Sequence, residues 1–484
     1  MKLINYNNIL IFFWFCILAS TNSHYSATLH FQSFELFTQS NFLNFINFLR
    51  FYIPFLILPI LIMMFFFTPI KKPNVLISLL IIYFCWQLLI FFISKRYVES
   101  SEIFFAHHYV GSVSYSEYDE TKFNILNLFF NAVSILFIFL VANNLNLQEF
   151  EKKLFIVTLC VVGLIAIYFT FNLISESIKY NLKFIYSSNT LRPDGVTFGQ
   201  PSPRITGISR MIIIFYFLFF FFLLNNYKRI IFYIILIILG LILYKMQTRG
   251  AIVGLLIVYF ILFLFHPFSL KKKIFIFLIL TIIPLLLFEL YYYSKKNILI
   301  FKPEINSIQK YNEHEPSSYN RLAELKNDTS GRVSIWKKSL VIVNEKKIFL
   351  GYGPQADRFL LLQHKIKNDK NNYYKYNNEV SIYDNNASNA LIYAYLCGGV
   401  VGFFLFSVIF SLAIVVIIKN IFYIKIFLHN KHSHNAWLHY STTLLTFLII
   451  RSLYENSFSI FGLDYIFFIL GYLMSRNSLL LRKI

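Results

Sequence analysis

Residues 244–259, YKMQTRGAIVGLLIVY, join two long apolar runs through a junction of a few polar residues. Each run approaches the roughly 20 apolar residues that a helix needs to cross a bilayer. Thr248 can cap a helix that begins near Ala251, and Gly250 lets a ligand approach the backbone. The pattern predicts a tight helical hairpin in a membrane, with the charge of Arg249 at its turn.

The whole chain is built from such apolar runs. Its 484 residues are 57% hydrophobic and 14% charged, which is too apolar for a soluble globular protein. The net charge of +21 would suggest nucleic acid in a soluble protein, but no soluble basic domain is present to bind it. Lysines that flank membrane spans explain the charge better, so membrane lipids are the expected surroundings. The four cysteines lie in apolar runs, which argues against a disulfide framework or a zinc site.

The apolar runs predict an all-α polytopic membrane protein of about twelve transmembrane helices. The predicted spans lie near residues 8–22, 49–70, 74–94, 123–142, 153–174, 211–226, 229–246, 251–267, 273–293, 388–418, 436–452 and 459–475. The first run also fits a signal peptide that follows Lys2. We expect an N-terminal membrane region at 1–293, one long loop at 294–387 between spans 9 and 10, and a C-terminal membrane region at 388–484.

Basic residues in alternate loops orient these spans, because lysine and arginine are enriched in cytoplasmic loops. If the N-terminus is cytoplasmic, most basic loop residues fall on the cytoplasmic side: Lys71, Lys72, Lys152, Lys153, Lys228, Arg229, Lys271, Lys273, Lys419, Lys425, Lys431, Arg476, Arg482 and Lys483. Lys95 and Arg96 are an exception, because they fall on the outer side. The same orientation places residues 95–122, 175–210, the junction at Arg249 and the long loop on the outer side.

Arg249 is therefore in a short outer hairpin, where arginine is scarce. Such a side chain can extend to the membrane interface. It can also bind an anion, because a helix N-terminus favours a phosphate and a guanidinium adds two hydrogen bonds to it. Residues 192–210, RPDGVTFGQPSPRITGISR, repeat the arginine pattern with Arg192, Arg204 and Arg210. Their proline and glycine content predicts a structured loop, and a merely solvated loop is the alternative.

A helix is predicted within residues 329–354, TSGRVSIWKKSLVIVNEKKIFLGYGP, followed by a turn at GYGP. One face of it carries Val333, Trp336, Leu340 and Val343. An amphipathic helix on the membrane surface would explain this face. It would not explain Arg332 in the first turn, where a cation is unfavourable unless an anion is near. In residues 385–406, polar residues precede a span that contains Gly398, Gly399 and Gly402, which permit close helix contact.

Three of these segments together resemble the O-antigen ligase and polymerase superfamily of bacterial envelopes, over roughly residues 190–405. In that family an Arg-Gly pair opens a transmembrane helix, as Arg249 and Gly250 do here. A Gly-Arg pair, a tryptophan and a Gly-x-Gly then follow, and they match Gly331, Arg332, Trp336, Gly351 and Gly353. A polar pair finally precedes a Gly-x-x-Gly span, which matches Ser388, Asn389, Gly399 and Gly402.

Ser388 departs from the ligase pattern, which has histidine followed by asparagine at the polar pair. The ligase histidine is proposed to activate the acceptor hydroxyl, and an ordinary serine cannot replace it as a base. This difference favours the polymerase branch, which often lacks the histidine. Residues 203–210, PRITGISR, are also more similar to polymerases.

The resemblance implies a metal-independent glycosyltransferase of the bacterial inner membrane, with a periplasmic active face and no cofactor. A polymerase of this kind moves a growing glycan from undecaprenyl pyrophosphate onto the next lipid-linked repeat. We expect Arg249 and Arg332 to be the main pyrophosphate ligands, and Asp384, His364 and Asp194 are the candidates for a general base. The expected substrate-binding residues are Arg204, Arg210, Arg192, Arg321, Gly250, Ser388 and Asn389.

Two other functions remain open from the sequence. An O-antigen ligase would transfer finished glycan to lipid A-core, and a flippase would move lipid-linked glycan across the membrane. A flippase needs a charged central cavity along many spans, whereas the arginines here gather on one side. A chain-length regulator protein is a partner that the resemblance leaves open.

Overall fold

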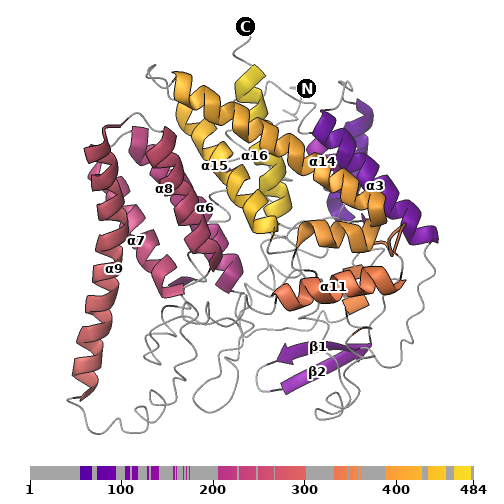
Figure 1. The fold of residues 1–484 in the computed structure, drawn as a ribbon, viewed down its shortest axis with the longest axis horizontal. Helices are drawn as coiled ribbons and strands as arrows, with labels where there is room; N and C mark the ends of the chain where they lie inside the picture. The colour runs from indigo at the N-terminus through magenta and orange to yellow at the C-terminus, as the bar shows by residue number, and fades with distance from the viewer. Residues whose placement is uncertain are drawn as a thin grey trace.

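The structure is a computed structural model, and it describes the helices and strands given below. It also describes short links beside them at 74, 228–229, 268–269, 348–354, 389 and 453, and single residues within 128–174, within 356–364 and at 387. It is a bundle of helices with a small hairpin beside it (Figure 1). The elements are a helix at Phe55–Phe67, α3 (Val75–Ile93), β1 (Phe104–Tyr109), β2 (Ser112–Glu117), α6 (Ile205–Asn225), α7 (Ile230–Met246), α8 (Arg249–Phe265), α9 (Leu270–Ile300), α11 (Arg332–Lys346), α14 (Ala390–Phe427), α15 (His434–Ser452) and α16 (Leu463–Leu480).

The helical membrane architecture predicted from the sequence is present. Among the described residues, three helices are long and apolar enough to cross a membrane: Val75–Ile93, Leu270–Tyr291 and Ala390–Tyr423. Shorter apolar helices include Ser209–Leu224, Ile230–Met246 and Ile252–Leu264. The outward side of α9 exposes apolar side chains such as Leu286 and Leu290, as expected for a surface that faces lipid. The full count of about twelve spans stays a prediction.

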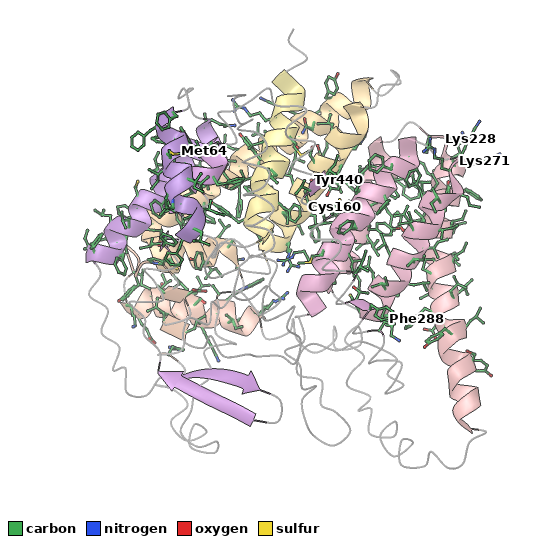
Figure 2. The ribbon with its side chains drawn as sticks, turned by 180° about the vertical axis from the view of Figure 1, so that it is seen from behind. Met64, Cys160, Lys228, Lys271, Phe288 and Tyr440 are labelled. Carbon is green, nitrogen blue, oxygen red and sulfur yellow. The ribbon has the colours of Figure 1, made fainter. Side chains whose placement is uncertain are left out.

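The ends of the helices alternate as the charge pattern requires. Figure 1 shows that α6, α8 and α14 begin at the end of the bundle where α7, α9 and α15 finish. Figure 2 shows Lys228 and Lys271 close together at the opposite end from Phe288, although one lies before α7 and the other at the start of α9. The basic loops between described helices therefore share one end. The Arg249 junction, α11 and the start of α14 lie at the other, which we call the arginine end (Figure 1).

The described residues also include one small β-hairpin, which the sequence analysis did not predict, beside the predicted helices. Within residues 95–122, expected as a polar loop, β1 and β2 form an antiparallel hairpin that pairs Phe104 with Glu117 and Tyr109 with Ser112. The alternating sequence SVSYSE of β2 has the period of two that is typical of a strand. Short strands give a much weaker pattern than membrane helices, which explains why the hairpin was not predicted.

Several boundaries also differ from the sequence predictions. Residues 205–210 were expected in a loop but form the start of α6. The helix α9 continues to Ile300 instead of ending near 293, and α14 extends to Phe427. Polar residues continue a helix beyond its apolar stretch, so hydropathy alone places helix ends too early.

The core is aromatic and centred on α15, which contacts α6, α8, α14 and α16. Its largest fully buried side chains include Tyr216 and Phe217 of α6, Phe447 of α15 and Phe467 of α16. The hydroxyls of Tyr216 and Tyr259 satisfy each other with a hydrogen bond of 2.9 Å. A second, smaller core lies between α11 and the start of α14 and includes Ile342, Ile348, Leu360, Tyr393 and Leu396.

Candidate functional site

The structure describes part of the predicted site. Arg192, Asp194, Arg204, Arg321, Asp384 and Ser388 lie outside the described residues. Arg249 is the first residue of α8, two residues earlier than the predicted helix start, and only its backbone is described. Gly250, Arg210, Arg332 and Asn389 are described and all belong to helix starts at the arginine end (Figure 1). His364 is half-buried in the segment that follows the GYGP turn.

Two glycines of α8 let its neighbours come close. A Cβ at Gly254 would meet Ile213 of α6 and lie 3.3 Å from the Phe447 ring of α15. One turn nearer the arginine end, a Cβ at Gly250 would lie 3.1 Å from the Nη1 atom of Arg451. Residues 250–254, GAIVG, therefore act as a small-residue face on which α6 and α15 pack, as in many membrane helix pairs.

Arg451 is a residue that the sequence analysis missed. It lies in the last turn of α15, and only 6% of its surface is exposed. The hydropathy pattern places Arg451 at the end of the predicted span 436–452, where a charged residue is ordinary. The criterion that selected Arg249 would also have selected Arg451, because it is another arginine at the outer end of a span.

Arg210 lies on α6, which packs against both α8 and α15. It is half-buried, and its Nε atom is shielded from solvent. A loop was predicted for residues 192–210, but its last six residues, including Arg210, belong to α6. A helical residue has its position set by the neighbouring helices, so Arg210 is held in place more firmly than a loop residue would be.

Asn389 joins the start of α14 to the end of α15. Its Oδ1 atom accepts hydrogen bonds from the N–H groups of Leu391 and Ile392, at 2.9 and 3.1 Å, and so caps α14. Its Nδ2 atom donates to the carbonyl oxygen of Leu453, at 2.9 Å. Both ends of this side chain are engaged, so the geometry assigns Asn389 a positioning role for the segment that begins with Ser388.

A buried carboxylate fixes the same segment from the other side. Asp357 is fully buried, and its Oδ2 atom accepts a hydrogen bond of 2.9 Å from the N–H of Ala387. The sequence analysis did not select Asp357, because a single aspartate after a glycine turn has no distinguishing spacing. Asp357 and Asn389 thus hold the backbone immediately before and after Ser388.

Arg332 is the first residue of α11, as predicted. The packed face of α11 agrees with the predicted one at Val343, which packs against the smaller core with Ile335 and Ile342. It differs at Leu340, which is 57% exposed, whereas Ser339 is buried. The Ser339 hydroxyl is buried because it donates to the Ile335 carbonyl, at 2.9 Å. An intrahelical bond of this kind lets a serine replace an apolar residue on a packed face, which a hydropathy pattern cannot show.

The turn after α11 docks into a break in α14. Gly399 has φ 62° and ψ −153° and interrupts the helix. Three backbone hydrogen bonds cross between the two segments, from Tyr352 to Leu396 (3.1 Å), from Gly353 to Cys397 (2.7 Å) and from Val400 to Phe349 (3.0 Å). The Trp86 indole of α3 donates to the carbonyl of Gly398, at 2.7 Å.

This docking also orients α11. Because α11 and the first part of α14 both lead to the break, the two packed helices run in the same direction, and their starts point the same way (Figure 1). The helix start with Arg332 therefore faces the same side as the start capped by Asn389. The Gly-x-Gly motif thus serves as a backbone clamp that sets the direction of α11.

The comparison with known families agrees with this geometry. Residues 233–407 match the family model described as O-antigen ligase. The match includes α8, α9, α11, the glycine clamp and the start of α14, while Arg210 and Arg451 lie outside it. No curated protein matches the chain. Members of the matched family are glycosyltransferase-like enzymes. Over residues 233–407 the chain is thus similar to the O-antigen ligase family, in agreement with the resemblance to the O-antigen ligase and polymerase superfamily.

Proposed function

We propose that the protein is a polymerase of O-antigen or of another surface polysaccharide. It transfers a growing glycan from undecaprenyl pyrophosphate onto the next lipid-linked repeat at the periplasmic face of the bacterial inner membrane. The observation that carries this proposal is the match of residues 233–407 to the O-antigen ligase family, because Arg249 and Gly250 begin α8 within the matched segment. The Nη1 atom of Arg451 lies 3.1 Å from the position of a Cβ at Gly250. A cationic site at one end of the bundle suits a transferase that acts on one side of the membrane only.

The chemistry follows from the leaving group. A hydroxyl oxygen of the acceptor sugar attacks the anomeric carbon, and the bond between that carbon and the diphosphate oxygen breaks. Negative charge builds on the departing diphosphate, and preorganised guanidinium groups stabilise it. A direct displacement inverts the sugar centre. The acceptor proton goes to a base, for which Asp384 is the proposed residue, although a good leaving group makes strong base catalysis less necessary.

Ser388 supports the polymerase over the ligase. The polar pair at the start of α14 has serine where the ligase pattern has histidine. The flippase alternative is less well supported, because the described centre of the bundle is filled by aromatic side chains such as Phe217, Phe447 and Phe467. A packed core of this kind leaves no charged passage between the described helices.

Deleting the gene tests the proposal, and we expect surface glycan that stops at a single repeat unit. The reason is that flipping and attachment of one repeat continue while polymerisation does not. The measurement is the length distribution of surface glycan on gels, with the wild-type gene restored as the control. Accumulation of long lipid-linked chains that remain unattached would instead identify a ligase, and an unchanged glycan would refute both.

A further inference from the structure

Gln87 is a polar side chain buried in the apolar helix α3. It is 5% exposed, and neither its Oε1 nor its Nε2 atom has a hydrogen-bond partner among the residues that the structure describes. Leu88 and Leu89 beside it are exposed, as expected where a helix faces lipid. Because bulk water does not reach an amide at such a place, leaving it unpaired is costly. A ligand that both donates and accepts hydrogen bonds would remove this cost.

Tyr83 adds a second polar group on the same helix. Its hydroxyl is buried and has no hydrogen-bond partner within the described part of the chain. It precedes Gln87 by four residues, so the two side chains share one face of α3. This face packs on α14, where the centroid of the Tyr83 ring lies 4.6 Å from that of Phe406 (Figure 1). Three buried polar atoms thus lie within about one helical turn of α3.

Two glycines of α14 face these side chains, one on each side of the break at Gly399. A Cβ at Gly398 would lie 2.9 Å from the Nε2 atom of Gln87. A Cβ at Gly402 would lie 3.6 Å from the Tyr83 ring. Gln87 therefore faces the start of the break and Tyr83 faces its end. The polar face of α3 and the glycine face of α14 enclose one place between the two helices.

The other polar groups at this place are already bonded. The Trp86 indole donates to the carbonyl of Gly398. The carbonyls of Leu396 and Cys397 accept hydrogen bonds from the turn that follows α11. Water commonly enters a helix where it is sharply kinked, because the break disturbs the ladder of backbone hydrogen bonds.

We propose that Gln87 and Tyr83 bind ordered water at the break of α14. The amide N–H of Gln87 donates to the water, and the amide oxygen accepts from it, while the Tyr83 hydroxyl supplies a third bond. A buried water molecule needs two to four polar partners of this kind. The amide and the hydroxyl are neutral groups, which suits water better than an ion. Residue 398 is then glycine because a methyl group would crowd the Gln87 amide.

This site would join α3 to the clamp that sets the direction of α11. Trp86 already ties α3 to the break through the Gly398 carbonyl, and bound water adds a second link one residue further along α3. The inference does not depend on the proposed transferase function. It concerns α3, which lies outside the segment that matches the family.

The test is X-ray footprinting of the purified full-length protein in lipid nanodiscs, read by mass spectrometry. The beam produces hydroxyl radicals from water, so a buried side chain that touches ordered water is oxidised faster than one sealed in an apolar core. The readout is the oxidation rate of Tyr83 relative to Tyr216, whose hydroxyl is bonded to Tyr259 in the aromatic core. We expect Tyr83 to react roughly tenfold faster than Tyr216 in the wild type, because bound water lies against it.

Gln87→Leu removes the amide but keeps a side chain of similar size. We expect this variant to fold and to lower the oxidation rate of Tyr83 roughly fivefold, because the water loses two of its partners. Gly398→Ala acts in the same direction by crowding the amide. The matched control is Leu89→Ala, at an exposed position of the same helix, which we expect to stay within about twofold of the wild type.

Equal oxidation of Tyr83 in the wild type and in Gln87→Leu would overturn the inference. A higher unfolding temperature of Gln87→Leu, together with unchanged oxidation, would show that the amide is buried without water. If Gln87→Leu does not fold, Gly398→Ala and the wild-type protein decide. Slower oxidation of Tyr83 in Gly398→Ala upholds the inference, and equal rates for Tyr83 and Tyr216 in the wild type overturn it.

Discussion

Replacing Arg249 with alanine is expected to lower the transfer rate by roughly 10²- to 10³-fold. Arg249 opens α8, so its charge adds to that of the helix N-terminus at the place where the diphosphate is proposed to leave. Transition-state charge grows as the sugar–phosphate bond breaks, and the loss therefore falls mainly on kcat. The measurement is the rate of purified enzyme at saturating donor, together with the glycan length in a deletion strain that carries the variant.

Arg332→Lys is the companion variant, because it keeps a positive charge at the start of α11 while removing the planar fork. We expect shortened glycans and a loss of about tenfold in rate. Arg229→Ala is the matched control, since Arg229 is exposed and directly follows Lys228, which lies at the opposite end of the bundle (Figure 2). Normal glycan length in both Arg249→Ala and Arg332→Lys would refute the proposed binding of pyrophosphate by these arginines.

Gly399→Ala is expected to destabilise the fold. The backbone of Gly399 has φ 62° and ψ −153°, a region that is almost restricted to glycine and costs other residues about 1–3 kcal/mol. A Cβ there would also overlap the carbonyl oxygen of Phe349. Because that oxygen accepts the hydrogen bond from Val400, the clamp between α11 and α14 cannot form without rearrangement. The measurement is thermal unfolding in detergent, where we expect a lower midpoint and less folded protein.

The control for this variant is Gly471→Ala in α16. A Cβ at Gly471 would find its nearest neighbour, the Ser441 carbonyl oxygen, at 3.7 Å, an ordinary contact. Alanine also favours a helix over glycine by about 0.5–1 kcal/mol. We expect Gly471→Ala to unfold at or slightly above the wild-type temperature. A Gly399→Ala protein that unfolds at the same temperature as the wild type would show that the clamp does not stabilise the bundle.

Much of the architecture could be predicted because membrane helices have a strong signature. The apolar runs located α3, α6, α7, α8, α9, α14, α15 and α16, with most boundaries within a few residues. The lysine-rich loops predicted which helix ends lie together, and Figure 2 places Lys228 and Lys271 accordingly. A desolvated backbone has to satisfy its own hydrogen bonds, so a long apolar run leaves few alternatives to a helix.

The convergence of the site could not be predicted in the same way. Gly250 and Arg451 are separated by about 200 residues along the chain and meet only because α8 and α15 pack together. Asp357 and the break at Gly399 depend on backbone contacts, which no residue pattern encodes. The face of α11 was misassigned at Leu340, because Ser339 is buried through an intrahelical bond while Leu340 is exposed.

The most direct test of the central claim is transfer by the purified full-length protein in liposomes that contain only a synthetic polyprenyl-pyrophosphate-linked repeat unit. The products are separated by length, and released polyprenyl diphosphate is counted against new glycosidic bonds. We predict a ladder of lipid-linked glycans, one released diphosphate per bond, and an unchanged rate in the presence of a metal chelator. The absence of any elongation under these conditions, or a requirement for lipid A-core as acceptor, would contradict the account.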